Sequence, residues 1–354
     1  MRRFLVIARL NERNAMEALV YAGPGAVEVR DVPNPEPGRG EVLVEIGHVG
    51  VCGTDHLLVR GGLARVRPGV VIGHEMAGRA VGGDLDRAGL RPGDPVAVEP
   101  LISCGVCRTC ARGHRHICET LGLYGIDRDG GAASHVAVPA DRLHRLPDGV
   151  PSRVAALAEP LSVAVHMVAR AGVAAGDKVM IFGGGPIGAL LGLVARLSGA
   201  GAVLVAEPRA DRRALLAELG MTVTDPLAAD VTAWCLNRAP GGVDVSFEVS
   251  GADASYAAAP EVTRPRGTVL VGALTDRPAR VPMSQVMFKE QRLVGSRVYT
   301  GDHMARAVSL MGTAGLPLDA LVSDVVPVRE APGRVFGGGP AGLMKTLIAA
   351  GDGS

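Results

Sequence analysis

The sequence is poor in aromatic residues and nearly balanced in charge. Only 3% of its 354 residues are Phe, Trp or Tyr, so the hydrophobic core must be built from Val, Leu, Ala and Ile. The formal net charge of +1 gives no electrostatic reason to expect nucleic acid or an anionic membrane as a partner. No apolar run approaches the roughly 20 residues that span a bilayer. Hydrophobic residues still make up 47%, which excludes a disordered chain.

No secretory signal is expected either. Met1-Arg2-Arg3 followed by Phe4–Ala8 imitates one, but this apolar stretch is shorter than about 7 residues. A more regular pattern begins at Met16, so residues 1–15 are interpreted as an N-terminal extension. We therefore expect a cytoplasmic protein. The chain is longer than one hydrophobic core usually serves, and two domains are expected.

Cysteine is scarce outside one short segment. Four of the six cysteines lie within residues 104–118, and the other two, Cys52 and Cys235, are isolated. A disulfide framework would spread its cysteines through a small secreted domain, so the clustering favours a metal. Four thiolates with the spacing Cys-x2-Cys-x2-Cys-x7-Cys suit a closed, tetrahedral, structural zinc site. The ligands would be Cys104, Cys107, Cys110 and Cys118.

Two hydrophobic patterns divide the chain. Up to about residue 150, short alternating stretches such as Glu41–Ile46 are interrupted by proline and glycine, as in antiparallel β structure. From about residue 165, strands such as Lys178–Phe182 and Ala202–Ala206 alternate with helical patterns, which indicates a doubly wound parallel sheet. After about residue 300 the chain is expected to return to the first domain and end in a strand near Lys345–Ala349. The predicted domains are residues 16–165 with 301–354, and residues 166–300.

A glycine-rich turn joins the strand Lys178–Phe182 to a helical pattern. Gly183, Gly185 and Gly188 have the G-x-G-x-x-G spacing of a dinucleotide site. There the glycines permit a tight turn, approach of the pyrophosphate and close packing of the helix. A structural glycine turn with no ligand is the alternative. We expect the other cofactor contacts to include Pro186, Ile187, Glu207, Arg209, Arg212, Ser250, Val271, Gly272 and Arg297.

The choice between NAD and NADP depends on the end of the second strand. Glu207 stands there, 19 residues after the last glycine, where a carboxylate binds ribose hydroxyls and repels a 2′-phosphate. Arg209 could instead pair with a 2′-phosphate. NAD is therefore favoured, with NADP as the alternative.

A second set of metal donors is dispersed along the chain. Cys52, the pair His74-Glu75 and Glu159 could each be inert when taken alone. Together they supply one soft donor, the thiolate, and three harder donors, the imidazole and the two carboxylates. This combination suits a catalytic zinc with one position open to water or substrate.

The order of these motifs resembles that of the zinc-containing medium-chain dehydrogenases. The segment Cys52–Asp55, the turn Gly73–Glu75, the four-cysteine segment and the loop Gly183–Gly188 occur in that family's sequence, and the resemblance extends from Met16 onward. It implies an α/β protein with a GroES-like, mostly β catalytic domain, a Rossmann domain, and an active site in the cleft between them. It also implies that Cys52, His74 and Glu75 are zinc ligands and that Glu159 binds the zinc or its water.

The resemblance is closer to the polyol branch of the family. Ala158–Val163 is similar to the segment that sorbitol and butanediol dehydrogenases carry, with a glutamate at Glu159. This implies hydride transfer from a secondary alcohol (a polyol, cyclitol, sugar or vicinal diol) to NAD(P). The two sets of metal donors predict two zinc ions per chain. Aldose and threonine dehydrogenases remain alternatives, as does a non-catalytic zinc- and NAD-binding structural or sensory protein. A homodimer or homotetramer is expected from the prevalence of such assemblies.

The proton path departs from that of many relatives. The hydroxyl of Thr54 is expected to pass the substrate proton outward through the cofactor ribose. Where many relatives have a histidine, this chain has Leu57, and its histidine stands one residue earlier, at His56. Because a shift of one residue redirects a side chain by about 100° on a helix, or to the opposite face of a strand, we expect His56 to face elsewhere.

Overall fold

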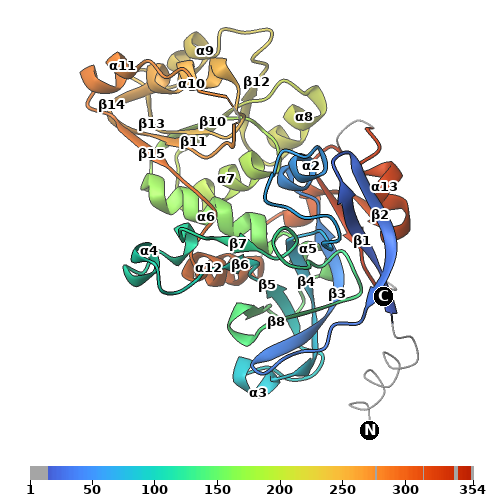
Figure 1. Cartoon of the computed structure of the whole chain (residues 1–354). Coiled ribbons are helices and arrows are strands. Elements are labelled where there is room, and N and C mark those ends of the chain that lie inside the picture. The colour runs from blue at the N-terminus through green and yellow to red at the C-terminus, as the bar shows by residue number, and fades with distance from the viewer. Residues whose placement is uncertain (1–14, 276, 314, 339–341, 352–354) are drawn as a thin grey trace. The chain divides into compact units, whose positions relative to one another are not determined.

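Residues 15–275, 277–313, 315–338 and 342–351 are described by the structure, which is a computed structural model. The expected N-terminal extension lies outside these residues, except for Ala15, which begins strand β1. The chain divides into two units, each with its own core (Figure 1). Unit 1 comprises residues 1–159 and 300–354, and unit 2 comprises residues 160–299. No helix of the described residues is both long and apolar enough to cross a membrane.

Unit 1 is built on a seven-stranded, mostly antiparallel sheet. Its strands follow the order β16-β17-β3-β4-β5-β9, and β8 pairs with β3. Only β16 and β17 pair in parallel. The strands are β3 (Glu41–Gly50), β4 (Glu75–Gly83), β5 (Pro95–Val98), β8 (His135–Pro139), β9 (Leu143–Arg145), β16 (Val322–Pro327) and β17 (Lys345–Ala349). Alternation decides which side is buried, because Val42, Val44 and Ile46 of β3 enter the core and Glu45 is exposed.

Two further strand pairs and several short helices complete unit 1. The pairs are β1 (Ala15–Gly23) with β2 (Ala26–Pro33), and β6 (Leu101–Ile102) with β7 (Gly122–Leu123). The helices are α2 (Gly53–Val59), α3 (Leu85–Ala88), α4 (Arg108–Ala111), α5 (Ser152–Ala155), α12 (Gly301–Met311) and α13 (Ala331–Arg334).

Unit 2 contains a six-stranded sheet in which every neighbouring pair is parallel, in the order β12-β11-β10-β13-β14-β15. The chain adds β11 and β12 on one side of β10 and then crosses to the other side with β13, so the switch point of the topology lies between β10 and β13. The strands are β10 (Lys178–Phe182), β11 (Ala202–Ala206), β12 (Thr222–Thr224), β13 (Val243–Glu248), β14 (Thr263–Val271) and β15 (Arg292–Gly295).

Helices cover both faces of this parallel sheet, as Figure 1 shows. Met180 and Phe182 of β10 pack with Cys235 and Val262, which belong to α9 and α10. Helix α7 covers the opposite face. The helices are α6 (Ala158–Ala171), α7 (Pro186–Leu197), α8 (Ala210–Glu218), α9 (Val231–Arg238), α10 (Asp253–Val262) and α11 (Met283–Phe288).

The predicted strands Lys178–Phe182, Ala202–Ala206 and Lys345–Ala349 have the same bounds as β10, β11 and β17, and the doubly wound parallel sheet is confirmed. The division between the units falls after Glu159, within the first turn of α6, whereas the sequence placed it after residue 165. From Pro160 onward α6 packs within unit 2. One contact that shows this is the hydrogen bond from Arg170 Nε to the carbonyl of Gly295, at 2.8 Å.

Candidate metal and dinucleotide sites

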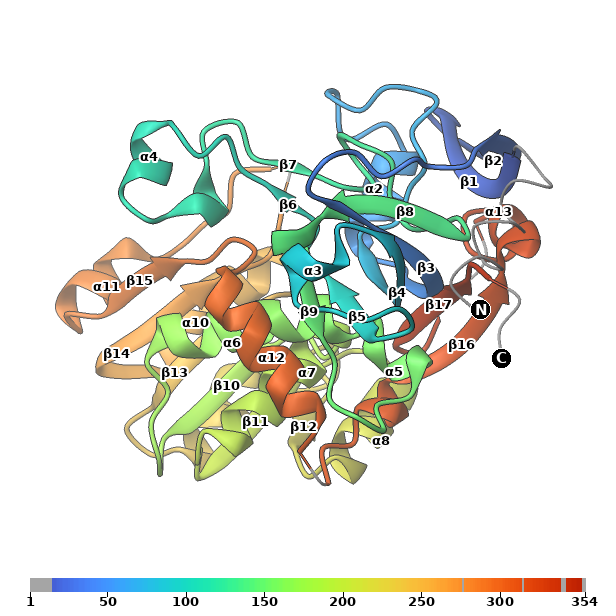
Figure 2. The ribbon, with the colours of Figure 1, turned by 90° about the horizontal axis from the view of Figure 1, so that it is seen from below.

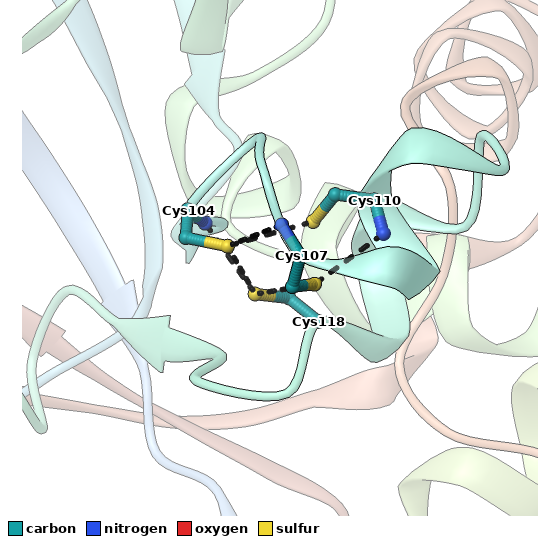
Figure 3. A group of neighbouring side chains, drawn as sticks. All are labelled: Cys104, Cys107, Cys110 and Cys118. Carbon is teal, nitrogen blue, oxygen red and sulfur yellow. Dashed lines mark hydrogen bonds between the residues drawn. The ribbon is translucent and has the colours of Figure 1, made fainter.

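The four clustered cysteines converge on one point. They lie on a segment around α4 that projects from the strands of unit 1 (Figure 2). Their sulfurs all lie within 4.8 Å of one another, with separations of 3.4 Å for Cys104–Cys118, 3.9 Å for Cys107–Cys118 and 4.0 Å for Cys104–Cys110 (Figure 3). Zn–S bonds of about 2.3 Å in a tetrahedron place sulfurs about 3.8 Å apart. The arrangement therefore fits one zinc ion.

Backbone N–H groups of the same segment point at the sulfurs. Cys104, Cys107 and Cys110 each donate to another cysteine of the set at 3.3–3.4 Å. The Cys104 N–H lowers the pKa of Cys118 to about 6, whereas burial and the neighbouring Cys107 raise the pKa of Cys110 to about 12. A dication would remove this imbalance, because it favours the thiolate form of all four side chains.

The second donor set also comes together, in unit 1. Cys52 immediately precedes α2, His74 precedes β4, and Glu75 is the first residue of β4. One donor atom of each lies within 4.8 Å of the others, and His74 and Glu75 are buried. Among the described residues no hydrogen-bond donor faces Glu75 Oε2, so this buried oxygen is free to bind a cation. A thiolate, an imidazole and a carboxylate suit a catalytic zinc.

Two residues that the sequence did not single out as functional hold these donors in place. The Asp55 carboxylate accepts a hydrogen bond from the Cys52 N–H at 2.8 Å, and its other oxygen lies 3.3 Å from His74 Nδ1. This contact leaves His74 Nε2 for the metal. Lys345 Nζ lies 2.7 Å from Glu75 Oε1 and donates to the Val51 carbonyl at 3.0 Å. Only its position in a short, mostly apolar strand distinguishes Lys345 in the sequence.

The charges in this site stabilise one another. Burial by itself disfavours the charged form of each group. The Asp55 carboxylate nevertheless raises the pKa of His74 well above its ordinary value, and His74 in turn lowers the pKa of Asp55. For Lys345 too the effect of burial is outweighed, chiefly by the charge of Glu75, and its pKa is raised.

Glu159 is not part of the three-residue set. It is buried in the first turn of α6, and its charge contributes to raising the pKa of Lys345. The structure therefore places it in the surroundings of the site and leaves its role as a ligand a prediction.

Thr54, His56 and Leu57 all lie on α2. Thr54 and His56 are two positions apart, so their side chains leave the helix in directions that differ by about 200°. The ring of His56 packs against Phe336, with 5.3 Å between the ring centroids.

In unit 2, the glycine turn has the geometry that a dinucleotide site requires. Gly183 follows β10 with φ +103°, a conformation that other residues rarely adopt. A Cβ on Gly188 would collide with the carbonyl oxygen of Gly183, so only glycine lets α7 approach the turn. Pro186 and Ile187 begin α7, and Pro suits a first helical position.

Glu207 lies against this turn. Its Oε2 accepts a hydrogen bond from Gly184 N–H and its Oε1 from Arg209 N–H, both at 2.9 Å. Arg212 Nη1 lies 4.0 Å from Glu207 Oε2, and it would be 3.5 Å from a Cβ on Gly185. The Arg209 guanidinium pairs with Asp211, with an Nε–Oδ1 distance of 3.0 Å.

The remaining predicted cofactor residues follow the ends of the neighbouring strands. Because the sheet is parallel, these ends share one edge. Ser250 follows β13, Val271 ends β14 with Gly272 directly after it, and Arg297 is exposed two residues beyond β15. The structure therefore brings the predicted dinucleotide residues to one edge of unit 2.

Known proteins match both units. Residues 38–148 match the alcohol dehydrogenase GroES-like domain, and residues 186–313 match the zinc-binding dehydrogenase family. The chain is 37% identical to 2-dehydro-3-deoxy-L-galactonate 5-dehydrogenase from Pseudoalteromonas atlantica, over 94% of this chain and 98% of that protein. It is 36% identical to L-threonine 3-dehydrogenase from Pyrococcus horikoshii, over 82% of this chain and 84% of that protein.

A solved structure supports the same assignment. It is described as a zinc-binding dehydrogenase from Sinorhizobium meliloti 1021 bound to NADP. It aligns with a TM-score of 0.89 and 33% identity, covering 95% of this chain and all of that one. The chain therefore belongs to the zinc-containing medium-chain dehydrogenases, as a GroES-like unit joined to a Rossmann unit, and is an NAD(P)-dependent oxidoreductase that acts on an alcohol.

Proposed function

We propose that this enzyme oxidises the secondary hydroxyl group of a polyhydroxylated substrate: a polyol, cyclitol, sugar, sugar acid or vicinal diol. The observation that carries the proposal is the donor set Cys52, His74 and Glu75, of which His74 and Glu75 are buried, in a chain that also has a dinucleotide turn. When bound, zinc supplies a Lewis acid that eases loss of the hydroxyl proton, and the nicotinamide accepts the hydride. The polyhydroxylated class is supported by the Pseudoalteromonas relative, whose name gives a sugar-acid substrate.

A substrate panel tests this proposal. Zinc-loaded enzyme would be assayed with 2-dehydro-3-deoxy-L-galactonate, sorbitol, myo-inositol, 2,3-butanediol, glucose, L-threonine and ethanol, each with NAD and NADP. We expect kcat/KM for at least one polyhydroxylated substrate or diol to exceed that for ethanol more than tenfold. Threonine is the second candidate, because the Pyrococcus relative is 36% identical. Ethanol as the best substrate would contradict the proposed class.

We also propose that Thr54 moves the substrate proton. Thr54 is two residues from Cys52, and its β-branched side chain has few rotamers, which keeps the hydroxyl in place. Thr54→Val is expected to lower kcat about 10²–10⁴-fold while zinc content stays at the wild-type value, because it removes a proton-transfer group. Steady-state kinetics and elemental analysis measure the two quantities.

His56→Ala is the matched control for that variant. Its ring packs against Phe336, so its loss should lower kcat less than tenfold. If His56→Ala were as damaging as Thr54→Val in a folded, zinc-loaded protein, His56 would be the relay.

For the cofactors we propose two zinc ions per chain and a preference for NAD. The Glu207 carboxylate, fixed at the glycine turn, would repel a 2′-phosphate. Arg209, the residue that could instead favour NADP, pairs with Asp211. Glu207→Ala should narrow the ratio of kcat/KM for NAD to that for NADP by roughly tenfold, since one charge is removed at close range. A wild-type enzyme that prefers NADP would overturn this assignment.

We propose in addition that the enzyme is a homo-oligomer, dimeric or tetrameric. Strand β15 is an edge of the parallel sheet, and Met287, Phe288 and Leu293 are exposed on or near it. An edge with free backbone groups and apolar side chains invites pairing with a second copy. Light scattering of purified enzyme should give at least twice the chain mass of 36.3 kDa, and Phe288→Glu should reduce it. A monomeric wild type would refute the proposal.

A further inference from the structure

Glu248 is a buried carboxylate that neither donor set contains. It is the last residue of β13, and its side chain is 0% exposed. Burying a carboxylate costs several kcal/mol unless hydrogen-bond donors surround it. Its partners therefore indicate what its burial achieves.

One carboxylate oxygen organises the turn that follows β13. Glu248 Oε1 accepts hydrogen bonds from Ser250 N–H at 2.9 Å, Gly251 N–H at 2.9 Å and the Ser250 hydroxyl at 2.6 Å. Tyr256 of α10 is also buried, and this burial together with the Glu248 charge raises the pKa of Tyr256 to about 12. One side chain thus accepts three hydrogen bonds from two consecutive residues of this turn.

The main chain of the same residue holds the neighbouring turn. The Glu248 carbonyl accepts hydrogen bonds from Gly272 N–H at 2.9 Å and Ala273 N–H at 3.2 Å. These two residues follow β14, where the nicotinamide half of a dinucleotide is expected. Glu248 therefore connects the turns after two adjacent strands.

The turn that Glu248 holds also contacts the glycine turn. Glu248 is in register with Phe182, the last residue of β10. A Cβ added to Gly183 would lie 3.1 Å from Ser250, so the two turns are already in close contact. They meet at the switch point between β10 and β13, which is where open parallel sheets bind their ligands.

We propose that Glu248 is a positioning residue for the dinucleotide, which fixes the Ser250 turn against the glycine turn and so sets the width of the crevice. The inference rests on the proposed cofactor site and extends it to a residue that need not touch the cofactor. If the carboxylate is removed, the N–H groups of Ser250 and Gly251 lose their acceptor and the turn is free to move. Cofactor affinity should fall, because the turn must then be ordered again on binding.

The dissociation constant of NADH for the zinc-loaded enzyme tests the proposal, with fluorescence of the bound nicotinamide as the signal. Glu248→Ala is expected to weaken NADH binding roughly tenfold or more, which corresponds to loss of one or two hydrogen bonds. If that variant does not fold, Glu248→Asp can be used instead. It retains the charge, but its shorter side chain moves the carboxylate away from the N–H groups, and NADH binding should weaken roughly fivefold. Glu248→Gln keeps an acceptor oxygen in place. Its dissociation constant for NADH should therefore stay within about threefold of the wild-type value.

A second buried glutamate provides a control that distinguishes an effect on cofactor binding from a general loss of stability. Glu99 of unit 1 is 5% exposed and is bound by Arg142 at 2.7 Å and His144 at 3.3 Å. Glu99→Ala should lower the melting temperature but change the NADH dissociation constant less than twofold. If Glu248→Ala and Glu248→Asp bind NADH within twofold of wild type, Glu248 is structural only and the inference is wrong. If wild type itself binds neither NADH nor NADPH, the proposed cofactor site fails instead.

Discussion

Cys52→Ser is expected to lower kcat/KM at least about a thousandfold and to remove one of two zinc ions per chain. A serine hydroxyl is a poor ligand for zinc at neutral pH, and the Lewis acid contributes several kcal/mol to the reaction. Elemental analysis of the untagged protein and steady-state kinetics measure the two effects. A variant that retained two zinc ions and most of its activity would contradict the assignment of Cys52 as a ligand.

Two other cysteines serve as comparisons. Cys107→Ser should lose the other zinc ion and destabilise the segment around α4, because a structural zinc contributes directly to folding. Cys235 lies in the core of unit 2 with 0% exposure, where burial raises the pKa of its thiol to about 11. Cys235→Ala should keep both zinc ions.

Lys345→Met is expected to destabilise the enzyme by about 3–5 kcal/mol, because it leaves the Glu75 carboxylate buried without its cation. The side chains of the pair are 4% and 1% exposed. The melting temperature of the metal-free enzyme should fall by roughly 5–15 °C, because zinc at Glu75 would otherwise supply a positive charge. Activity should fall as well, since Glu75 belongs to the proposed metal site. Calorimetry and kinetics measure these changes.

An exposed ion pair with the same 2.7 Å separation gives the control. Arg329 lies 2.7 Å from Glu17, with side chains 75% and 43% exposed. Arg329→Met should cost less than about 1 kcal/mol because water solvates both charges. If the two variants melted at the same temperature, the Lys345 contact would not be the stabilising interaction that its burial indicates.

Sequence patterns predicted the parts of this molecule that are formed by residues close to one another in the chain. The bounds of β10 and β11 follow from short apolar runs between a turn and a glycine, and the glycine turn follows from spacing alone. The four-cysteine site needed only 15 residues of sequence. In each case the residues that meet in space are near one another in the chain, so their pattern is sufficient.

The sequence did not reveal the residues that support the site. Lys345 reaches Glu75 across 270 positions, and no periodic pattern links a lysine in one strand to a glutamate in another. Asp55 was visible within the Cys52 motif, but its contact with His74 arises from the packing of α2 beside the start of β4. Glu248 was missed because its function is exerted through the backbone of its neighbours.

The position of Lys345 in β17 also determines when the surroundings of the proposed metal site are completed during synthesis. Strand β17 pairs with β3, and it is made after all of residues 160–299. Until β17 emerges from the ribosome, the Val49–Gly50 end of β3 lacks one neighbour, and Glu75 lacks its cation. Unit 2, which is continuous in sequence, has no such delay. We therefore expect a nascent chain to contain a folded dinucleotide unit before the surroundings of Glu75 are complete, with the unpaired β3 edge exposed to aggregation in the interval.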